Sequence, residues 1–97
     1  MISVKFHEKV VALADESLIG KTLEEGMKHL DVTERFYKGE LKTDEEVIQI
    51  LKDADNLNLV GEEVVGIALK EGFINEEDVV TIEGVPHVQI YNLRESK

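Results

Sequence analysis

Three histidines are the residues best suited to acid–base or metal chemistry near neutral pH, because imidazole titrates in that range. They stand at positions 7, 29 and 87, and none has a second histidine or an acid at a recognised metal-ligand spacing. His87 differs from the others, because Pro86 restricts the chain before it and Gln89 follows two positions later. On a strand these two side chains would share one face and could recognise a carbonyl, an amide or a base edge. The structural alternative is a hydrogen-bonded pair that closes a hairpin.

A second group of useful side chains occupies residues 34–39, which read Glu-Arg-Phe-Tyr-Lys-Gly in a loop-like region. Aromatic rings beside cations are typical of interface anchors and of sites that stack on nucleobases. Only 5% of the chain is aromatic, so this segment is a local concentration. We therefore expect Arg35 and Tyr37 to contact a partner. The alternative is that Phe36 belongs to the core and Tyr37 lies at its boundary, with its hydroxyl group in water.

The segment 57–63 has the order strand, glycine, helix, with Gly61 at the junction. The first amide groups of a helix have no partner inside it and can bind an anion. The phosphate-loop pattern is absent, however, and the two glutamates after the glycine would repel a phosphate. The junction, with Asn58 and with Lys21 assisting, is thus an alternative candidate site. In the structural alternative, Gly61 only allows the chain to turn.

No spacing in the sequence indicates a catalytic centre. The serines lack the elbow motif that exposes a nucleophile, and most carboxylates lie on segments predicted to be helix surface. Because the chain has no cysteine, a thiolate nucleophile, a thiolate zinc site and a disulfide framework are excluded. We expect no catalytic residue, no metal and no cofactor, and we favour a noncatalytic protein over an enzyme.

The hydrophobic pattern of the first third predicts strands. Residues 2–6 alternate between apolar and polar, and 10–14 are apolar, so we predict an N-terminal β-hairpin. Residues 15–20 predict a single turn that ends at a glycine. Residues 22–33 are ambiguous, because a capping-box pattern competes with an interrupting glycine. Here we favour a short irregular piece followed by a strand over 27–32.

Two helices are predicted in the second half. Thr43 and Glu46 form a capping-box pattern before an amphipathic stretch that continues to Ala54. The second helix covers residues 62–71, and Gly72 is well placed to end it in a left-handed conformation. A single capped turn is predicted over 75–78, and further strands over 56–60, 79–82 and 88–93, with residues 83–86 joining the last two.

These elements predict one α+β domain over residues 1–97, with a mixed sheet of about five or six short strands and two main helices on one face. The 97 residues suffice for one domain but not for two, and 42% hydrophobic residues suffice for a core. No apolar run is long enough to cross a bilayer, and the start of the chain lacks a signal-peptide pattern. We therefore expect a cytoplasmic protein without a membrane partner.

The net charge of −10 comes almost entirely from the middle of the chain. Residues 43–78 carry 11 acidic and 2 basic side chains, whereas residues 1–42 carry 8 and 7. A basic or metal-rich partner could dock on the acidic segment, although a solvated helical surface is the simpler interpretation. Strong nonspecific nucleic-acid binding is not expected, because phosphates require clustered cations. RNA contact restricted to residues 1–42 stays open.

Four strings carry a family resemblance, namely residues 20–26, 34–39, 54–62 and 84–89. In this order and at this spacing the chain resembles the archaeal family catalogued as domain of unknown function 424, over nearly its whole length. The resemblance implies a small cytoplasmic archaeal protein of one domain, and it implies no biochemical activity.

We therefore expect a noncatalytic interaction module for an unknown protein partner, alone or within a protein–RNA assembly. The alternative is a small-ligand or anion-binding protein, or an enzyme, that uses the junction from Asn58 to Glu63. A monomer or a homodimer is expected, since exposed sheet edges can pair across a two-fold axis. The candidate binding residues are Lys21, Arg35, Tyr37, Asn58, Gly61, His87 and Gln89.

Overall fold

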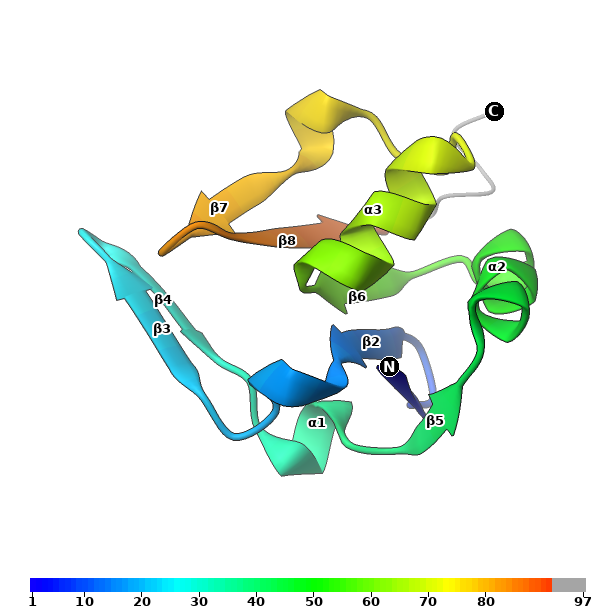
Figure 1. Ribbon diagram of the computed structural model, residues 1–97, viewed down its shortest axis with the longest axis horizontal. Coiled ribbons are helices and arrows are strands. Elements are labelled where there is room, and N and C mark those ends of the chain that lie inside the picture. The colour runs from blue at the N-terminus through cyan, green and yellow to red at the C-terminus, as the bar shows by residue number, and fades with distance from the viewer. Residues whose placement is uncertain (92–97) are drawn as a thin grey trace.

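A mixed six-stranded sheet forms the centre of the computed structural model, which describes residues 1–91 (Figure 1). In order across the sheet the strands are β5 (Glu40–Lys42), β1 (Ile2–Phe6), β2 (Val11–Asp15), β6 (Leu57–Val60), β8 (Val85–Ile90) and β7 (Val80–Ile82). Only the central pair, β2 and β6, is parallel among these neighbours. The expected α+β fold and the N-terminal hairpin of β1 and β2 are therefore confirmed.

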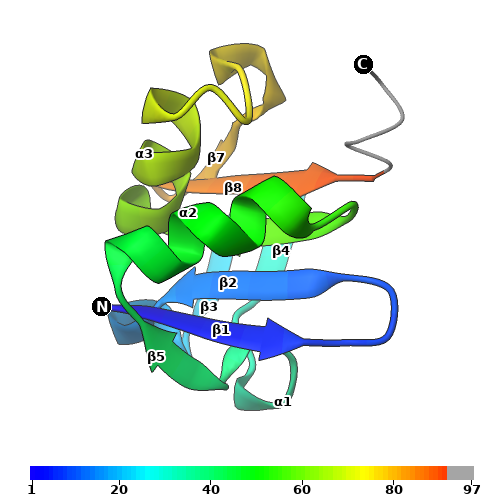
Figure 2. The same ribbon diagram turned by 90° about the vertical axis from the view of Figure 1, so that its right-hand side faces the viewer.

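Two helices, α2 (Asp44–Asp53) and α3 (Glu62–Lys70), cover one face of the sheet (Figure 2). Their apolar residues pack on inward-facing residues of β1, β2, β6 and β8 to form the larger core. Its buried members include Ile2, Val4, Leu13, Val47, Leu51, Leu57, Leu59, Val64, Val65 and Val88. The prediction that both main helices lie on one face is thus confirmed. Within residues 1–91, no helix is long and apolar enough to cross a membrane.

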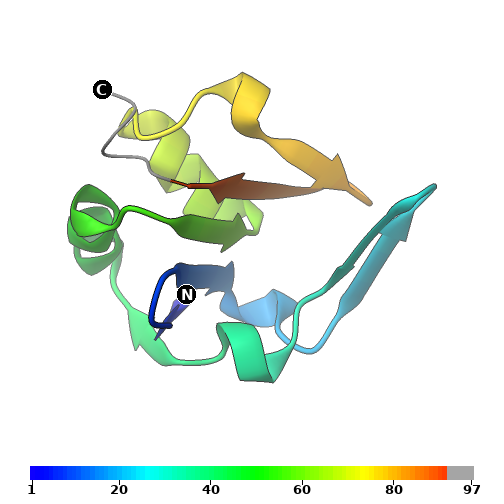
Figure 3. The same ribbon diagram turned by 180° about the vertical axis from the view of Figure 1, so that it is seen from behind.

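The opposite face is covered by shorter elements. These are a 3-10 turn (η1, Glu16–Leu18), the hairpin of β3 (Thr22–Glu25) and β4 (Lys28–Asp31), and the one-turn helix α1 (Glu34–Tyr37) (Figure 3). Ala12 and Ala14 of β2 are fully buried there and leave room for larger side chains from outside the sheet. Tyr37, Leu23 and Val32 fill that room and form the second core cluster.

The start of α2 and the end of α3 are capped as their residue types predict. The Thr43 hydroxyl accepts from the Glu46 amide at 3.2 Å, and the Glu46 carboxylate accepts from the Thr43 amide at 2.9 Å. At the far end of α3, Gly72 adopts a φ of +79°. There the Phe73 amide donates to the Ala68 carbonyl at 2.9 Å, which completes a Schellman motif. The capping box and the left-handed stop were predicted, and both are confirmed.

Three short elements differ from the prediction. Residues 22–25, expected to be irregular, form β3, because Leu23 is buried opposite Leu30 and Gly26 makes the turn to β4. Residues 34–37, expected to be loop, form α1, whose first turn is capped by Thr33. Strand β5 was not predicted, because it is only three residues long and gains its hydrogen bonds from β1.

The last hairpin is tighter than predicted. Its turn consists of Glu83 and Gly84, both with positive φ, so β8 begins at Val85 and not at residue 88. The predicted strand over 88–93 extends beyond the described residues. A 3-10 turn (η2, Glu76–Asp78) precedes β7, as expected.

Polar contacts tie the β3–β4 hairpin to the β7–β8 hairpin. The Glu24 amide donates to the Glu83 carboxylate at 2.6 Å, and the Glu83 amide donates to the Glu25 carboxylate at 2.7 Å. Lys28 Nζ also donates to the Thr81 carbonyl at 2.9 Å. The smaller sheet is thereby fixed over the second core cluster.

Two glycines should respond to alanine with opposite signs. A methyl group at Gly39 would overlap the Val4 carbonyl group, whereas a methyl group at Gly66 would meet open space on α3. We expect Gly39→Ala to lower the free energy of unfolding by about 1 to 3 kcal/mol through overpacking. We expect Gly66→Ala to raise it by up to about 1 kcal/mol, because alanine is the better helix former. Urea unfolding measures both values, and a neutral Gly39→Ala would contradict the close approach of residue 39 to β1.

Candidate functional site

Tyr37 and Asn58 form a buried polar pair beneath the sheet. Helix α1 directs Tyr37 into the second core cluster, where it is only 2% exposed, and its hydroxyl donates to Asn58 Oδ1 at 2.6 Å. Burial raises the pKa of Tyr37 to about 12, although the bond to Asn58 acts in the opposite direction. The phenol is therefore a permanent donor near neutral pH. The structural alternative, a boundary residue with its hydroxyl group in water, was wrong, because α1 turns the ring inward. At 2% exposure Tyr37 also has almost no surface for the direct partner contact expected of it.

The other end of the Asn58 amide is open. Asn58 is 7% exposed, and no group within residues 1–91 accepts a hydrogen bond from its Nδ2. Every fully buried side-chain polar atom in this part of the chain has a hydrogen-bond partner. Because Asn58 Nδ2 has none, it must reach the surface. It emerges beside Gln89, which pairs with Asn58 across β6 and β8 and is exposed. Opposite residues of an antiparallel pair lie on one face, a few ångströms apart.

His87 extends this row by one register step. It pairs with Val60, two residues from Asn58, and is half-buried. Its Nδ1 donates to the Leu59 carbonyl at 2.9 Å. Burial lowers the pKa of His87, and the bond to Leu59 only partly opposes this. The ring is therefore neutral, with Nε2 as a hydrogen-bond acceptor.

Asn58, His87 and Gln89 together form a surface that we name the amide face. It presents a donor from Asn58, an acceptor from His87, and both from Gln89. His87 and Gln89 share one sheet face, as the alternation of β8 requires. The predicted alternative was a hydrogen bond between His87 and Gln89, but His87 Nδ1 donates to the Leu59 carbonyl instead. Val80 of β7, which pairs with His87 and is partly exposed, adds an apolar border.

Two other candidate residues lie apart from the amide face. Arg35 is exposed on α1, and Lys21 is exposed at the base of the β3–β4 hairpin. The Lys21 carbonyl accepts from the Val32 amide at 2.8 Å, which fixes that base. Neither residue is hydrogen-bonded to the amide face or to the β6–α3 junction.

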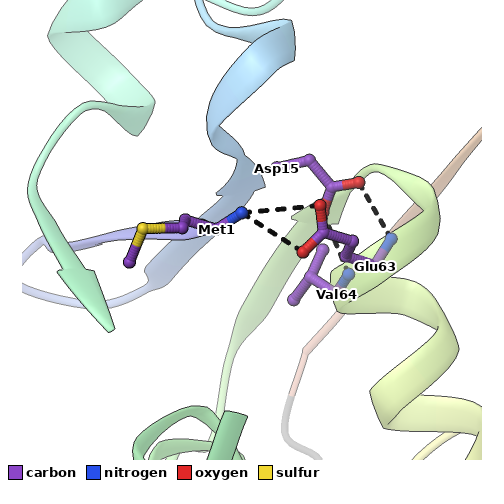
Figure 4. A network of polar contacts seen from close by, with 4 residues as sticks. All are labelled: Met1, Asp15, Glu63 and Val64. Atoms are coloured by element: carbon purple, nitrogen blue, oxygen red, sulfur yellow. Dashed lines mark hydrogen bonds and ion pairs between the residues drawn. The ribbon is translucent and has the colours of Figure 1, made fainter. Parts of the chain in front are cut away.

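The junction at Gly61 is occupied by a side chain that the sequence did not suggest. Asp15, the last residue of β2, accepts from the Glu63 amide at 2.8 Å and from the Val64 amide at 3.0 Å (Figure 4). The Met1 ammonium group lies 3.3 Å from the Glu63 carboxylate. Gly61 has a φ of +120°, and a methyl group there would overlap the Asp15 carboxyl group.

Burial raises the pKa of Asp15, although the two amide bonds oppose this effect. An external anion at this helix terminus would have to displace a carboxylate that is 6% exposed. The only sequence signal for this arrangement was an aspartate at the end of a strand, which does not reveal what it contacts. Within residues 1–91, no group of three histidine, aspartate or glutamate side chains could hold a metal ion.

A family model described as "Protein of unknown function (DUF424)" matches residues 3–93. The chain belongs to the DUF424 family. The resemblance drawn from four strings is thereby confirmed. All seven candidate residues of this DUF424 protein lie inside the matched region.

The DUF424 fold also occurs in a solved structure. An uncharacterized conserved protein from Methanopyrus kandleri is 26% identical and superposes with a TM-score of 0.71. The match covers 94% of this chain and 89% of the other. A comparison with curated proteins found no match.

Removing the Tyr37 hydroxyl should leave a buried amide without its partner. We expect Tyr37→Phe to lower the free energy of unfolding by about 1 to 2 kcal/mol. Tyr91, at 63% exposure, provides the matched control, because Tyr91→Phe should change nothing measurable. Chemical denaturation compares the two variants. Equal, negligible effects would mean that the bond between Tyr37 and Asn58 does not stabilise the fold.

The two perturbed histidines should give opposite pH slopes. The pKa of His87 lies below its ordinary 6.5, so the unfolded chain binds more protons, and stability falls as pH drops below 6.5. Hydrogen bonds to Asp31 and Glu24 raise the pKa of His29, so its contribution is present below 6.5 and is lost as pH rises through the raised value. His87→Gln should remove the first slope and His29→Gln the second. Urea midpoints between about pH 5 and 8 test this, and slopes of equal sign would contradict it.

Proposed function

We propose that this DUF424 protein is a noncatalytic interaction module of the archaeal cytoplasm, whose amide face contacts a protein partner, alone or within a protein–RNA assembly. The observation that carries the proposal is the Asn58 amide, which is nine-tenths buried, anchored at one end and open at the other. An archaeal setting is supported by the structural relative from Methanopyrus kandleri.

Pre-orientation makes the open end of Asn58 suited to binding. The Tyr37 hydroxyl fixes one end of the amide, so little side-chain freedom remains to be lost when a partner is bound. A partner that supplies an acceptor would satisfy this buried donor and bind more tightly. A partner without an acceptor would leave the donor without a hydrogen bond and bind more weakly. This is how a surface gains selectivity for a particular polar group.

The chemistry of the amide face favours recognition over catalysis. Two of its three side chains are amides, which neither gain nor lose protons near neutral pH. The third, His87, is held neutral with one nitrogen committed to the Leu59 carbonyl. Amides and a neutral imidazole can read the polar groups of a peptide backbone or the edge of an unpaired base. Arg35 of α1 and Lys21 at the base of the β3–β4 hairpin are exposed on the same side of the sheet as the amide face, and we propose them as peripheral contacts.

The alternative site at the β6–α3 junction is less favoured. The Glu63 and Val64 amides at the start of α3 already donate to Asp15, whereas Asn58 Nδ2 has no partner within residues 1–91. The amide face is therefore the better place to test.

A photoreactive residue can show what touches the amide face. Benzoylphenylalanine is placed at position 89 and, as the matched control, at position 81, which is exposed on the neighbouring strand but faces the other side of the sheet. Each protein is irradiated in lysate of its source organism, and the adducts are analysed with and without ribonuclease. We expect a discrete adduct from position 89 alone, and ribonuclease shows whether RNA is part of it.

Gln89→Ala supplies the second arm. Gln89→Ala should weaken capture of the crosslinked partner by roughly tenfold, because one hydrogen bond that is buried in the complex would be lost. It should not change the melting temperature, because Gln89 is exposed in the free protein. Thr81→Ala should change neither property. Adducts of equal yield from both positions, or unchanged capture by Gln89→Ala, would refute the amide face as the contact surface.

A further inference from the structure

The two outer strands of the six-stranded sheet, β5 and β7, differ in how their free edges are covered. Thr81 of β7 pairs with Pro86, whose carbonyl already accepts from the Gly61 amide, so the main-chain groups of Thr81 point outward. The Thr81 carbonyl accepts from Lys28 Nζ at 2.9 Å. A lysine at a sheet edge hinders the pairing of a further strand. The edge at β7 is therefore protected within the chain.

The free edge of β5 has no such cover (Figure 2). Just after β1 the His7 amide donates to the Val10 carbonyl, so the odd-numbered residues of β1 bond to β2 and the even-numbered ones to β5. The residues of β5 that pair with even-numbered positions are Glu40 and Lys42. Leu41 lies between them and must direct its amide and carbonyl outward. Neither group has a hydrogen-bond partner in residues 1–91.

The side chains of β5 favour a second strand of a particular composition. Leu41 is 43% exposed and, together with Ile19, lines a recess of about 320 Å³ at this edge. Glu40 and Lys42 lie on the other face of the strand, where Lys42 Nζ is 2.9 Å from the Glu40 carboxylate. A strand that pairs here should bring an apolar residue opposite Leu41, a cation opposite Glu40 and an anion opposite Lys42.

We propose that this strand is β5 of a second copy of the chain, so that two sheets join edge to edge. In an antiparallel pair with Leu41 opposite Leu41, each Glu40 faces the Lys42 of the other copy. The sequence Glu-Leu-Lys is thus complementary to itself, as a two-fold interface requires. The ion pair inside each strand stays intact, because a carboxylate accepts and an ammonium group donates more than one hydrogen bond.

The same register also suits the main chain. The outward amide and carbonyl of Leu41 in the two copies would exchange hydrogen bonds with each other. Glu40 and Lys42 would then occupy the non-hydrogen-bonded positions, where side chains across an antiparallel pair come closest. A shift by one residue would place Leu41 opposite a residue whose main-chain groups already bond to β1. Backbone and charge therefore select one register.

The contact is small, so the dimer should be weak and reversible. Because β5 has only three residues, the interface should be smaller than the roughly 1,200 Å² that stable complexes bury. The net charge of −10 opposes association, but salt at physiological strength screens exposed charges that are more than about 8 Å apart. We therefore expect the dimer to form at high protein concentration.

The dimer would leave the amide face open. Strands β6 and β8, which carry that face, are separated from β5 by β1 and β2, so the two proposals do not depend on each other. Antiparallel pairing about a two-fold axis keeps equivalent faces of the two sheets together. Both amide faces would then lie on one side of the joined sheet, where a partner with two recognised groups could bind both.

Charge exchange along β5 tests this interface. Glu40→Lys and Lys42→Glu each place like charges opposite one another, so each should weaken self-association by roughly tenfold or more. The double variant restores opposite charges without changing the net charge, and its dissociation constant should lie within about threefold of the wild-type value. An equimolar mixture of the two single variants should form a heterodimer. Sedimentation equilibrium at up to about 1 mM protein measures each association.

Hydrogen exchange in the wild-type protein tests the same edge even if a variant folds poorly. The Leu41 amide should exchange more slowly as the protein concentration rises, because the dimer gives it a hydrogen bond. The Thr81 amide also points outward, and as the matched control it should not change. A wild-type protein that stays monomeric at about 1 mM would overturn the proposal. So would a dimer that the single variants leave intact, or a double variant as weak as the single ones.

Discussion

The bond between the end of β2 and the start of α3 is the constraint on which the rest of the molecule depends. Asp15 places a carboxylate against the amides of Glu63 and Val64, and it fits only because residue 61 has no Cβ atom. Two orphan helix donors and one buried carboxylate thus satisfy each other, so none remains without a partner. The contact spans 48 residues of sequence and joins the end of β2 to the helix that follows β6, the parallel neighbour of β2.

The consequences extend to both faces of the sheet. With α3 fixed against β2 and β6, residues such as Leu13, Leu57 and Leu59 are directed into the larger core. The alternate residues of the same strands must then face the other way, and in β2 they are alanines. That choice admits Tyr37, whose hydroxyl reaches Asn58 in the central strand. The orientation of the Asn58 amide therefore derives from the same packing that positions α3.

Sequence patterns predicted the elements that depend on local chemistry. The capping box at Thr43 and the left-handed stop at Gly72 each use residues a few positions apart, and both were found. The patterns failed where distant strands decide the outcome, as for β5, which exists because β1 supplies its partners. The same limit applied to the site. The alternation of β8 placed His87 and Gln89 on one face, but nothing local could pair Tyr37 with Asn58 or Asp15 with α3.

Charge differs between the two sides of the sheet. The helix layer contains the acidic segment, so a negatively charged molecule on that side would meet a repulsion that falls as the salt concentration rises. On the other side, the elements that surround the amide face come from residues 1–42, whose acids and bases nearly balance, so the selectivity that we propose for the amide face depends on hydrogen bonds. A buried amide with one fixed end is suited to that task, because hydrogen-bond geometry discriminates between partners where net charge cannot. The two sides of the sheet thus differ in what they present to a binding partner, which is net negative charge on the helix side and oriented hydrogen-bonding groups at the amide face.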